Sequence, residues 1–141
     1  EFATQKIAEL GLTIQDDKTL VVEFDGKGMA KRGRPLQYLG FIYDGRGSRV
    51  RAGSTSRYLR KLRTAVRAAK ASQAKTSKAA AHLELPPKPL YKSRLRRIYS
   101  PWGQRTFLSY LERSVQIMGR DRTLFNQRSV LHGKFMVEWL G

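Results

Sequence analysis

The stretch from residue 36 to residue 45 limits the fold of this chain more than any other part of it. It reads Leu-Gln-Tyr-Leu-Gly-Phe-Ile-Tyr-Asp-Gly, a run of strand-forming residues that ends in Asp-Gly. Asp-Gly after such a run predicts a hairpin, because the turn needs positive φ angles. We expect residues 48–52 to form the return strand. Gly40, in the middle of the first strand, is expected to mark a bulge or the close approach of another backbone.

The segment before this hairpin predicts one helix and one strand. Apolar residues of the stretch 2–10 fall roughly on one face, and Gly11 is a suitable helix stop. Residues 20–24, Leu-Val-Val-Glu-Phe, favour a strand. Asp16 and Asp17 lie between them. Two-metal phosphoryl transfer uses paired aspartates, but a polar turn that faces water is the simpler explanation.

A basic loop connects this strand to the hairpin. Its sequence Lys31-Arg32-Gly33-Arg34-Pro35 contains the core of an AT-hook, which lays Arg-Gly-Arg into the narrow minor groove of A·T-rich DNA. The four residues Arg32-Gly33-Arg34-Pro35 that match the motif are weak support in so basic a chain. A flexible loop between two strands is therefore the interpretation that we favour.

The charge of the chain indicates a polyanionic partner. Its 141 residues carry a formal net charge of +17, from 28 basic and 11 acidic side chains. This excess favours nucleic acid, and less often an anionic membrane surface. No apolar run approaches the ~18 residues that a membrane-spanning helix needs, and no signal peptide is evident, so we expect a cytoplasmic protein. Cys is absent and the two imidazoles, His82 and His132, are far apart in the sequence, so we expect no metal site.

A basic helix is expected directly after the hairpin, with Ser54, Thr55 or Ser56 as its N-cap. Apolar residues then recur with the helical period at Tyr58, Leu59, Leu62, Ala65, Val66 and Ala69. The other face carries Arg57, Arg60, Lys61, Arg63, Arg67 and Lys70. No acidic residue lies between Asp44 and Glu84 to relieve the repulsion. We therefore favour contact with phosphates over a simply solvated surface.

Further helices complete the predicted α+β chain, in which residues 1–53 form a small α/β piece and residues 54–141 a bundle of three or four helices. Residues 71–81 either prolong the basic helix or begin a flexible connection that runs to residue 89, where prolines break any helix. Helices then follow over 90–98, up to residue 118, and after Asp121. The apolar residues expected in their core are Tyr91, Leu95, Ile98, Tyr99, Phe107, Leu108, Leu111, Val115, Met118, Leu124, Phe125, Leu131, Phe135 and Leu140.

Three segments, in their order along the chain, resemble the carboxy-terminal part of a bacterial reverse transcriptase. Residues 7–19, Ile-Ala-Glu-Leu-Gly-Leu-Thr-Ile-Gln-Asp-Asp-Lys-Thr, resemble motif D of the palm. Residues 36–45, with the core Tyr-Leu-Gly-Phe, resemble motif E, the primer grip. Residues 99–110, Tyr-Ser-Pro-Trp-Gly-Gln-Arg-Thr-Phe-Leu-Ser-Tyr, are similar to a thumb segment of retron-like and defence-associated members. The resemblance covers nearly the whole chain.

This resemblance implies RNA-directed DNA synthesis, with the end of the palm followed by a helical thumb that holds the template–primer duplex. Lys18 matches the motif D lysine, a candidate general acid for the leaving pyrophosphate, although an ordinary lysine at a strand start is the other explanation. The primer grip corresponds to Tyr38, Leu39, Gly40 and Phe41. The cations expected on nucleic acid are Arg57, Arg60, Lys61, Arg63, Arg67, Lys70, Arg94, Arg97 and Arg105.

One departure from the family limits these implications. Its metal-binding aspartates lie in motif A and in a Tyr-x-Asp-Asp hairpin, and neither motif is present in this sequence. We expect Mg²⁺ in a part of the parent enzyme outside this sequence, and we expect this chain alone to bind but not to polymerise. It would be a trimmed chain, a proteolytic product or one part of a split enzyme. Its partners would be RNA template, DNA primer, non-coding RNA and the amino-terminal part of the enzyme.

Two other interpretations stay open. The first is a stand-alone basic module that binds DNA or RNA and is either AT-hook-like or ribosome-associated. The second is a non-enzymatic, maturase-like RNA chaperone that uses the same scaffold. Among the parents that the resemblance allows, a retron, an antiviral defence system or a group II intron, residues 99–110 favour the first two.

Overall fold

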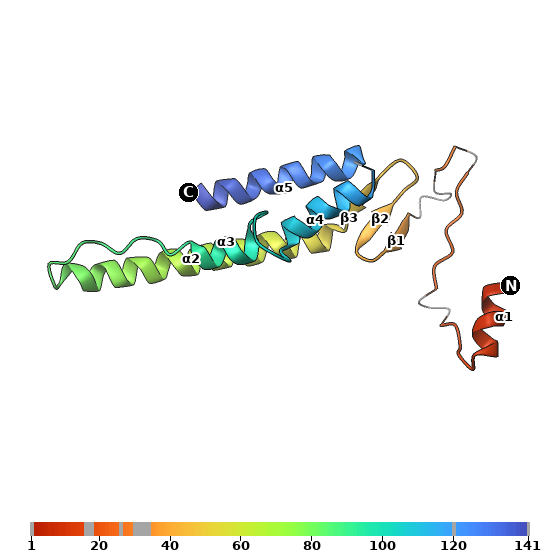
Figure 1. The fold of residues 1–141 in the computed structure, drawn as a ribbon, viewed down its shortest axis with the longest axis horizontal. Helices are drawn as coiled ribbons and strands as arrows, with labels where there is room; N and C mark the ends of the chain where they lie inside the picture. The colour runs from red at the N-terminus through yellow and green to blue at the C-terminus, as the bar shows by residue number, and fades with distance from the viewer. Residues whose placement is uncertain (1, 16–18, 26, 30–34, 120, 141) are drawn as a thin grey trace.

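The computed structural model describes residues 2–15, 19–25, 27–29, 35–119 and 121–140. In these ranges its elements are α1 (Phe2–Glu9), β1 (Leu36–Tyr38), β2 (Phe41–Tyr43), β3 (Ser48–Val50), α2 (Ala52–Ala81), α3 (Ser93–Tyr99), α4 (Phe107–Ile117) and α5 (Arg122–Leu140). Figure 1 shows α2 as the long axis of the molecule, with the sheet at its amino-terminal end and α3, α4 and α5 packed along it. The predicted α+β class is confirmed.

The predicted hairpin is a three-stranded antiparallel sheet in the order β1-β2-β3. The first strand does not continue through Gly40: β1 pairs Tyr38 with Phe41 of β2, so that Leu39 and Gly40 form a two-residue turn. Both turn residues have positive φ, 46° and 87°, as a type I′ hairpin turn requires. The prediction that Gly40 lies in the middle of a strand is therefore wrong, because Gly40 is part of the turn between β1 and β2.

The predicted Asp-Gly turn is confirmed between β2 and β3, where Tyr43 pairs with Ser48. Asp44 Oδ1 accepts hydrogen bonds from the backbone N–H groups of Arg46 at 3.0 Å and Gly47 at 3.2 Å. These two bonds, aided by the Arg49 guanidinium, lower the pKa of Asp44 below its usual value. The return strand ends at Val50, earlier than expected.

The amino-terminal segment contributes little to the packing. Helix α1 buries none of its residues, and Gly11 follows it with a φ of 70°, as expected for a helix stop. The predicted strand over 20–24 is wrong, because in this segment the structure records only an isolated bridge at Phe24. Strand-forming residues without a partner strand form no ladder. The Phe24 ring lies 5.7 Å from that of Tyr43, between ring centroids.

Helix α2 begins earlier than predicted, and at its other end it follows the longer of the two predicted alternatives. It begins at Ala52 without a side-chain cap, ahead of the expected N-caps, and it continues through residues 71–81 as 30 residues. The alternative of a flexible connection over 71–81 is therefore wrong, and the helix ends before the prolines as expected. By contrast, α3 begins only at Ser93, so Tyr91 belongs to the extended chain before it.

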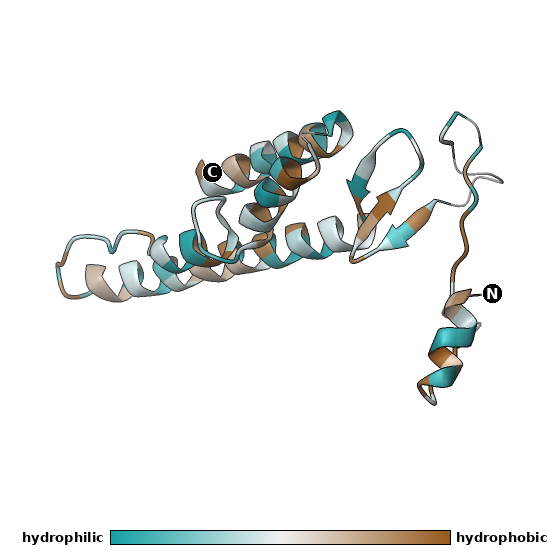
Figure 2. Cartoon of the chain, turned by 45° about the vertical axis from the view of Figure 1, so that its right-hand side comes forward, coloured by the Kyte–Doolittle hydropathy of each residue, from teal (hydrophilic) through white to brown (hydrophobic). Residues whose placement is uncertain are grey.

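One core joins the sheet to α2, α3, α4 and α5. Its buried residues are Val50, Tyr58, Leu62, Val66, Leu95, Leu108, Leu111, Val115, Leu124, Leu131 and Phe135. Figure 2 shows hydrophobic residues in the strands and around α4 and α5, whereas α2 is hydrophilic or neutral over most of its length. Five residues predicted for the core are instead exposed, namely Tyr91, Ile98, Met118, Phe125 and Leu140. No helix in the described ranges is both long and apolar enough to cross a membrane.

The side chains of Gln127 in α5 and of Asp121, the residue before α5, hold the sheet against the bundle. Gln127 Oε1 accepts from the backbone N–H of Val50 at 2.7 Å, and its Nε2 donates to the Val50 carbonyl at 3.1 Å. Asp121 Oδ2 accepts from the Ser48 N–H at 2.7 Å. Its Oδ1 caps α5 by accepting from the N–H groups of Thr123 and Leu124, which confirms the predicted cap. The outer edge of β3 is thus paired by side chains.

Candidate nucleic-acid interface

The amino-terminal half of α2 presents a group of exposed cations. Because Tyr58, Leu62 and Val66 are buried at intervals of four residues, the opposite side of the helix faces solvent. Four exposed cations lie outside that buried strip: Arg57, Arg60, Lys61 and Arg67. None of these four forms an ion pair or hydrogen bond with any residue that the structure describes. We call these four residues the basic face.

Two further cations of α2 are already engaged within the chain. Arg63 Nε lies 2.9 Å from Glu138 Oε1 of α5, and the two side chains are 53% and 27% exposed. Lys70 also has an interaction of its own. The sequence predicted Arg63 and Lys70 on the same open face as the other four cations, but Arg63 is directed toward α5, where it forms an ion pair with Glu138.

The cations of α3 and of the residues next to it form two groups, one in contact with neighbouring elements and one exposed to solvent. Lys92 Nζ donates to the Trp139 carbonyl at 2.9 Å and lies over the Trp139 ring, and the Arg96 guanidinium lies over the ring of Trp102. These contacts attach α3 to its neighbours. Arg94, Arg97 and Arg105 are exposed and pair with no carboxylate of the described chain. Three of the predicted cations therefore stay available at the surface.

The β1–β2 turn lies next to the start of α2. The backbone N–H of Arg51, the residue before the helix, donates to the Gly40 carbonyl at 3.0 Å. At the tip, the side chains of Tyr38 and Leu39 are 69% and 75% exposed. Phe41 instead faces the bundle, with its ring centroid 5.8 Å from that of Tyr110. Of the four predicted primer-grip residues, Tyr38 and Leu39 are thus exposed to solvent and Phe41 packs against the bundle. The Gly40 carbonyl connects the turn to the start of α2.

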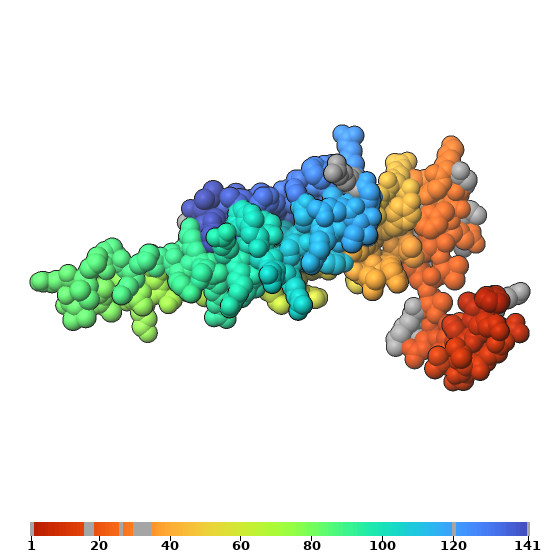
Figure 3. Space-filling view, in the orientation of Figure 1, coloured from red at the N-terminus to blue at the C-terminus, as the bar shows by residue number. Residues whose placement is uncertain are grey.

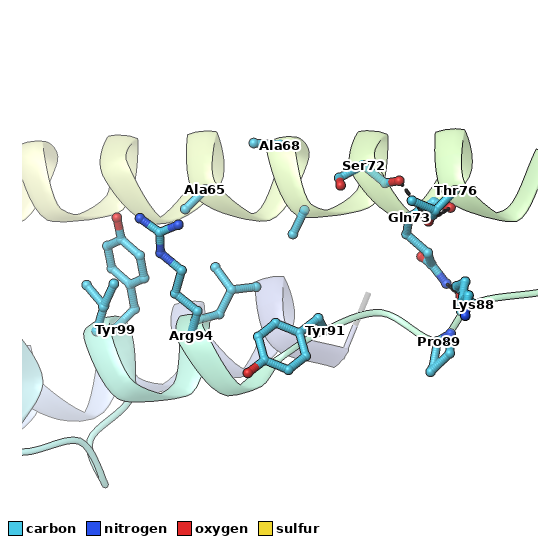
Figure 4. Close-up of a pocket in the computed structure, with 13 residues that line it drawn as sticks. Ala65, Ala68, Ser72, Gln73, Thr76, Lys88, Pro89, Tyr91, Arg94 and Tyr99 are labelled. Carbon is cyan, nitrogen blue, oxygen red and sulfur yellow. Dashed lines mark hydrogen bonds between the residues drawn. The ribbon is translucent and has the colours of Figure 1, made fainter. Parts of the chain in front are cut away.

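A groove separates α2 from α3 and from the extended chain before α3. Its volume is about 640 Å³. Figure 4 shows the rings of Tyr91 and Tyr99 and the side chain of Arg94 on the α3 side, opposite Ala65 of α2. Sequence analysis missed this groove, since Tyr91 was expected in the core. The run of small residues along one strip of α2 was the only sequence feature that could have indicated it.

Several predicted site residues lie outside the described residues. These are the candidate general acid Lys18, the pair Asp16 and Asp17, and the Arg32-Gly33-Arg34 segment. Among the residues that are described, no three His, Asp or Glu side chains gather closely enough to hold a metal ion. The described part of the chain therefore offers no ligand set for the Mg²⁺ that the family resemblance implies for the parent enzyme.

The geometry thus places an exposed turn next to a basic helix, with an aromatic groove further along the same helix. The turn lies in residues 36–45, one of the segments in which the sequence resembles a polymerase palm, whereas the basic face lies outside the three segments named above. That resemblance stays a prediction. No protein-family model matches the chain, and no curated protein matches it either.

Proposed function

We propose that this chain is the end of the palm and the thumb of a reverse transcriptase, and that it binds the template–primer duplex. One observation carries the proposal: the hydrogen bond between Arg51 and Gly40 sets the exposed turn directly at the start of the basic helix. In the proposed complex the turn meets the primer end, and the duplex backbone runs from there along α2.

The dimensions of α2 suit a duplex. A helix of 30 residues is about 45 Å long, which exceeds the ~34 Å of one turn of B-form DNA. Arg57, the first residue of the basic face, lies about 8 Å along the helix from its beginning next to the turn. Phosphates close to the primer end are therefore within reach of the basic face while the turn contacts that end.

Phosphate contacts of this kind position a duplex without reading its sequence. Each arginine or lysine of the basic face replaces condensed counterions on the nucleic acid, so affinity falls steeply with salt. The turn adds an apolar contact. Because its two positive φ angles fix the backbone, Leu39 and Tyr38 meet the primer end without a large loss of conformational entropy.

The test compares two triple variants of equal charge. Replacing Arg57, Arg60 and Arg67 by Gln removes three cations of the basic face. The control replaces the exposed Lys27, Arg122 and Lys134 by Gln, and it lowers the net charge by the same amount at other places. Binding to an RNA–DNA hybrid is measured by fluorescence anisotropy at several salt concentrations.

The basic-face variant is expected to flatten the log–log salt dependence by up to about three units, and the control by much less. Equal flattening in both variants would mean that only the overall charge matters, which contradicts a defined duplex site. A tenfold or greater preference for A·T-rich over G·C-rich DNA, unaffected by the basic-face substitutions, would favour the AT-hook interpretation instead.

A further inference from the structure

The groove between α2 and α3 is held open by a fixed third wall. Lys88 donates its backbone N–H to Ser77 Oγ at 3.1 Å, and its carbonyl accepts from Gln73 Nε2 at 3.1 Å. At the other end, the Tyr58 hydroxyl donates to the Tyr99 carbonyl at 2.8 Å and ties α3 to α2. The prolines around Lys88 further restrict the chain. The groove is therefore preformed, as small-ligand sites usually are.

The groove has small residues on one wall and aromatic residues on the other. Ala65, Ala68, Ala69 and Ser72 line it from α2, and none of them has a side chain long enough to fill it. Across from them, the Tyr91 side chain is 76% exposed. An aromatic ring left open to solvent beside an apolar surface is suited to stacking on a flat ligand.

The walls of the groove carry only positive charge. Lys88 and Arg94 line it, and no acidic residue occurs in the stretches 45–83 and 85–111, which form both walls. Charge complementarity therefore favours an anionic ligand. A nucleic acid meets both requirements, because its flat bases can stack on the tyrosine and its phosphates are negatively charged. Its bases can enter a groove only where they are unpaired, so the ligand is single-stranded.

We propose that this groove binds unpaired bases of a single-stranded nucleic acid, with one base stacked on Tyr91 and with Arg94 and Lys88 on the adjoining phosphates. The groove is centred away from the basic face, because Ala69 follows Arg60 by nine residues and so lies about 180° around α2 from it. Ala68 lies on the same side of the helix as Arg57 and Lys61, but it follows them by eleven and seven residues and so lies roughly 17 Å and 11 Å further along the axis. The inference rests on the proposed function only in requiring a nucleic-acid partner. It assigns single strands and the duplex to two separate sites along one helix.

The experiment uses the full chain and fluorescein-labelled strands of about 12 nucleotides, within the range of single-strand sites. One strand carries uracil bases, and a second has the same phosphates but no bases. Affinities are measured by anisotropy for the parent chain and for Tyr91→Ala, Tyr91→Phe and Ala68→Leu, of which the last places a larger side chain in the groove. The RNA–DNA hybrid is titrated against each variant in parallel.

The parent chain is expected to prefer the strand with bases. Tyr91→Ala is expected to weaken binding of that strand roughly 5- to 150-fold, the equivalent of one lost base stack, and Ala68→Leu is expected to act in the same direction. Tyr91→Phe retains the ring and should restore the affinity. The strand without bases and the hybrid should bind all variants equally, since neither offers a base to the groove.

Equal binding of the two single strands by the parent chain, or an unchanged affinity in both Tyr91→Ala and Ala68→Leu, would overturn the assignment. A polyglutamate peptide that binds with the same sensitivity to Tyr91→Ala would replace the nucleic acid by an acidic peptide and would equally overturn it. Failure of the duplex proposal is seen separately, in the hybrid titration of the basic-face variant.

Discussion

Tyr58 connects three parts of the bundle through a single side chain. Its ring stacks on Phe107 with 4.9 Å between centroids, and its hydroxyl donates to the Tyr99 carbonyl. Burial, with a smaller effect from Tyr99, raises the pKa of Tyr58 well above its usual value near 10. Helical spacing alone predicted that Tyr58 faces the core. The partner of its hydroxyl, 41 residues away in the chain, depends on how α3 packs and could not be predicted locally.

Replacing Tyr58 by Phe should lower the free energy of unfolding by about 1 kcal/mol near neutral pH, because one hydrogen bond is lost while the ring stays. Because the pKa of Tyr58 is raised in the folded chain, the free energy of unfolding also depends on pH. The neutral phenol contributes stability that is fully present below the unfolded-state pKa of about 10 and is lost as the pH rises above it. Urea unfolding between pH 8 and pH 11 should thus decline more steeply in the parent chain than in Tyr58→Phe. Tyr38→Phe, at an exposed position, is the control, and it should change neither the free energy of unfolding nor its pH dependence.

Gly103 and Gly53 make a matched pair of glycines. A Cβ atom at Gly103 would lie 2.4 Å from the Arg97 carbonyl oxygen and 2.5 Å from Thr106 Cγ2, whereas at Gly53, in the first turn of α2, it would meet nothing within 4 Å. We expect Gly103→Ala to destabilise the chain by about 1–3 kcal/mol through overpacking. Gly53→Ala should stabilise it by about 0.4–1 kcal/mol. Thermal melts of the two variants measure both effects, and a neutral Gly103→Ala would contradict the tight turn.

Among the elements, the helices were the most predictable and the strands the least. The 3.6-residue period of α2 and the Asp121 cap of α5 are local features, and both are confirmed. The start of α2 was missed because Ser54–Ser56 resemble caps, whereas tertiary contacts fix the preceding residues: Val50 is paired by Gln127 and Arg51 by Gly40. The split at residues 39–40 and the absent ladder over 20–24 depend on which strands find partners, which a single segment does not reveal.

The pairing of β3 with α5 depends on one amide side chain. Gln127→Ala should leave the N–H and C=O groups of Val50 without their partner and lower the free energy of unfolding by about 1–3 kcal/mol. Because the loss is local to the sheet edge, hydrogen exchange at the Val50 amide should accelerate more than at the core of α2. Gln116→Ala, at an exposed position of α4, is the control for a lost amide. Unchanged exchange at Val50 would show that Gln127 does not hold the edge.

At the scale of the whole molecule, charge and core lie in the same part of the chain. Residues 1–34 contain six basic and six acidic side chains, so the entire net charge of +17 comes from residues 35–141, with 22 basic and five acidic ones. All buried core residues lie between Val50 and Phe135. Helix α1, coloured red in Figure 3, buries none of its residues. Residues 35–141 thus contain everything that the proposed duplex site and the groove require.

A chain of residues 35–141 is therefore expected to unfold cooperatively, with a melting temperature close to that of the full chain. Once circular dichroism has shown that it folds, its affinity for the RNA–DNA hybrid and its salt dependence should match those of the full chain, because removing residues 1–34 leaves the net charge and the basic face unchanged. The AT-hook interpretation predicts the opposite result, because Arg32 and Arg34 are then absent. A folded chain that binds duplexes at least tenfold more weakly would mean that the leading segment, and not α2, holds the nucleic acid.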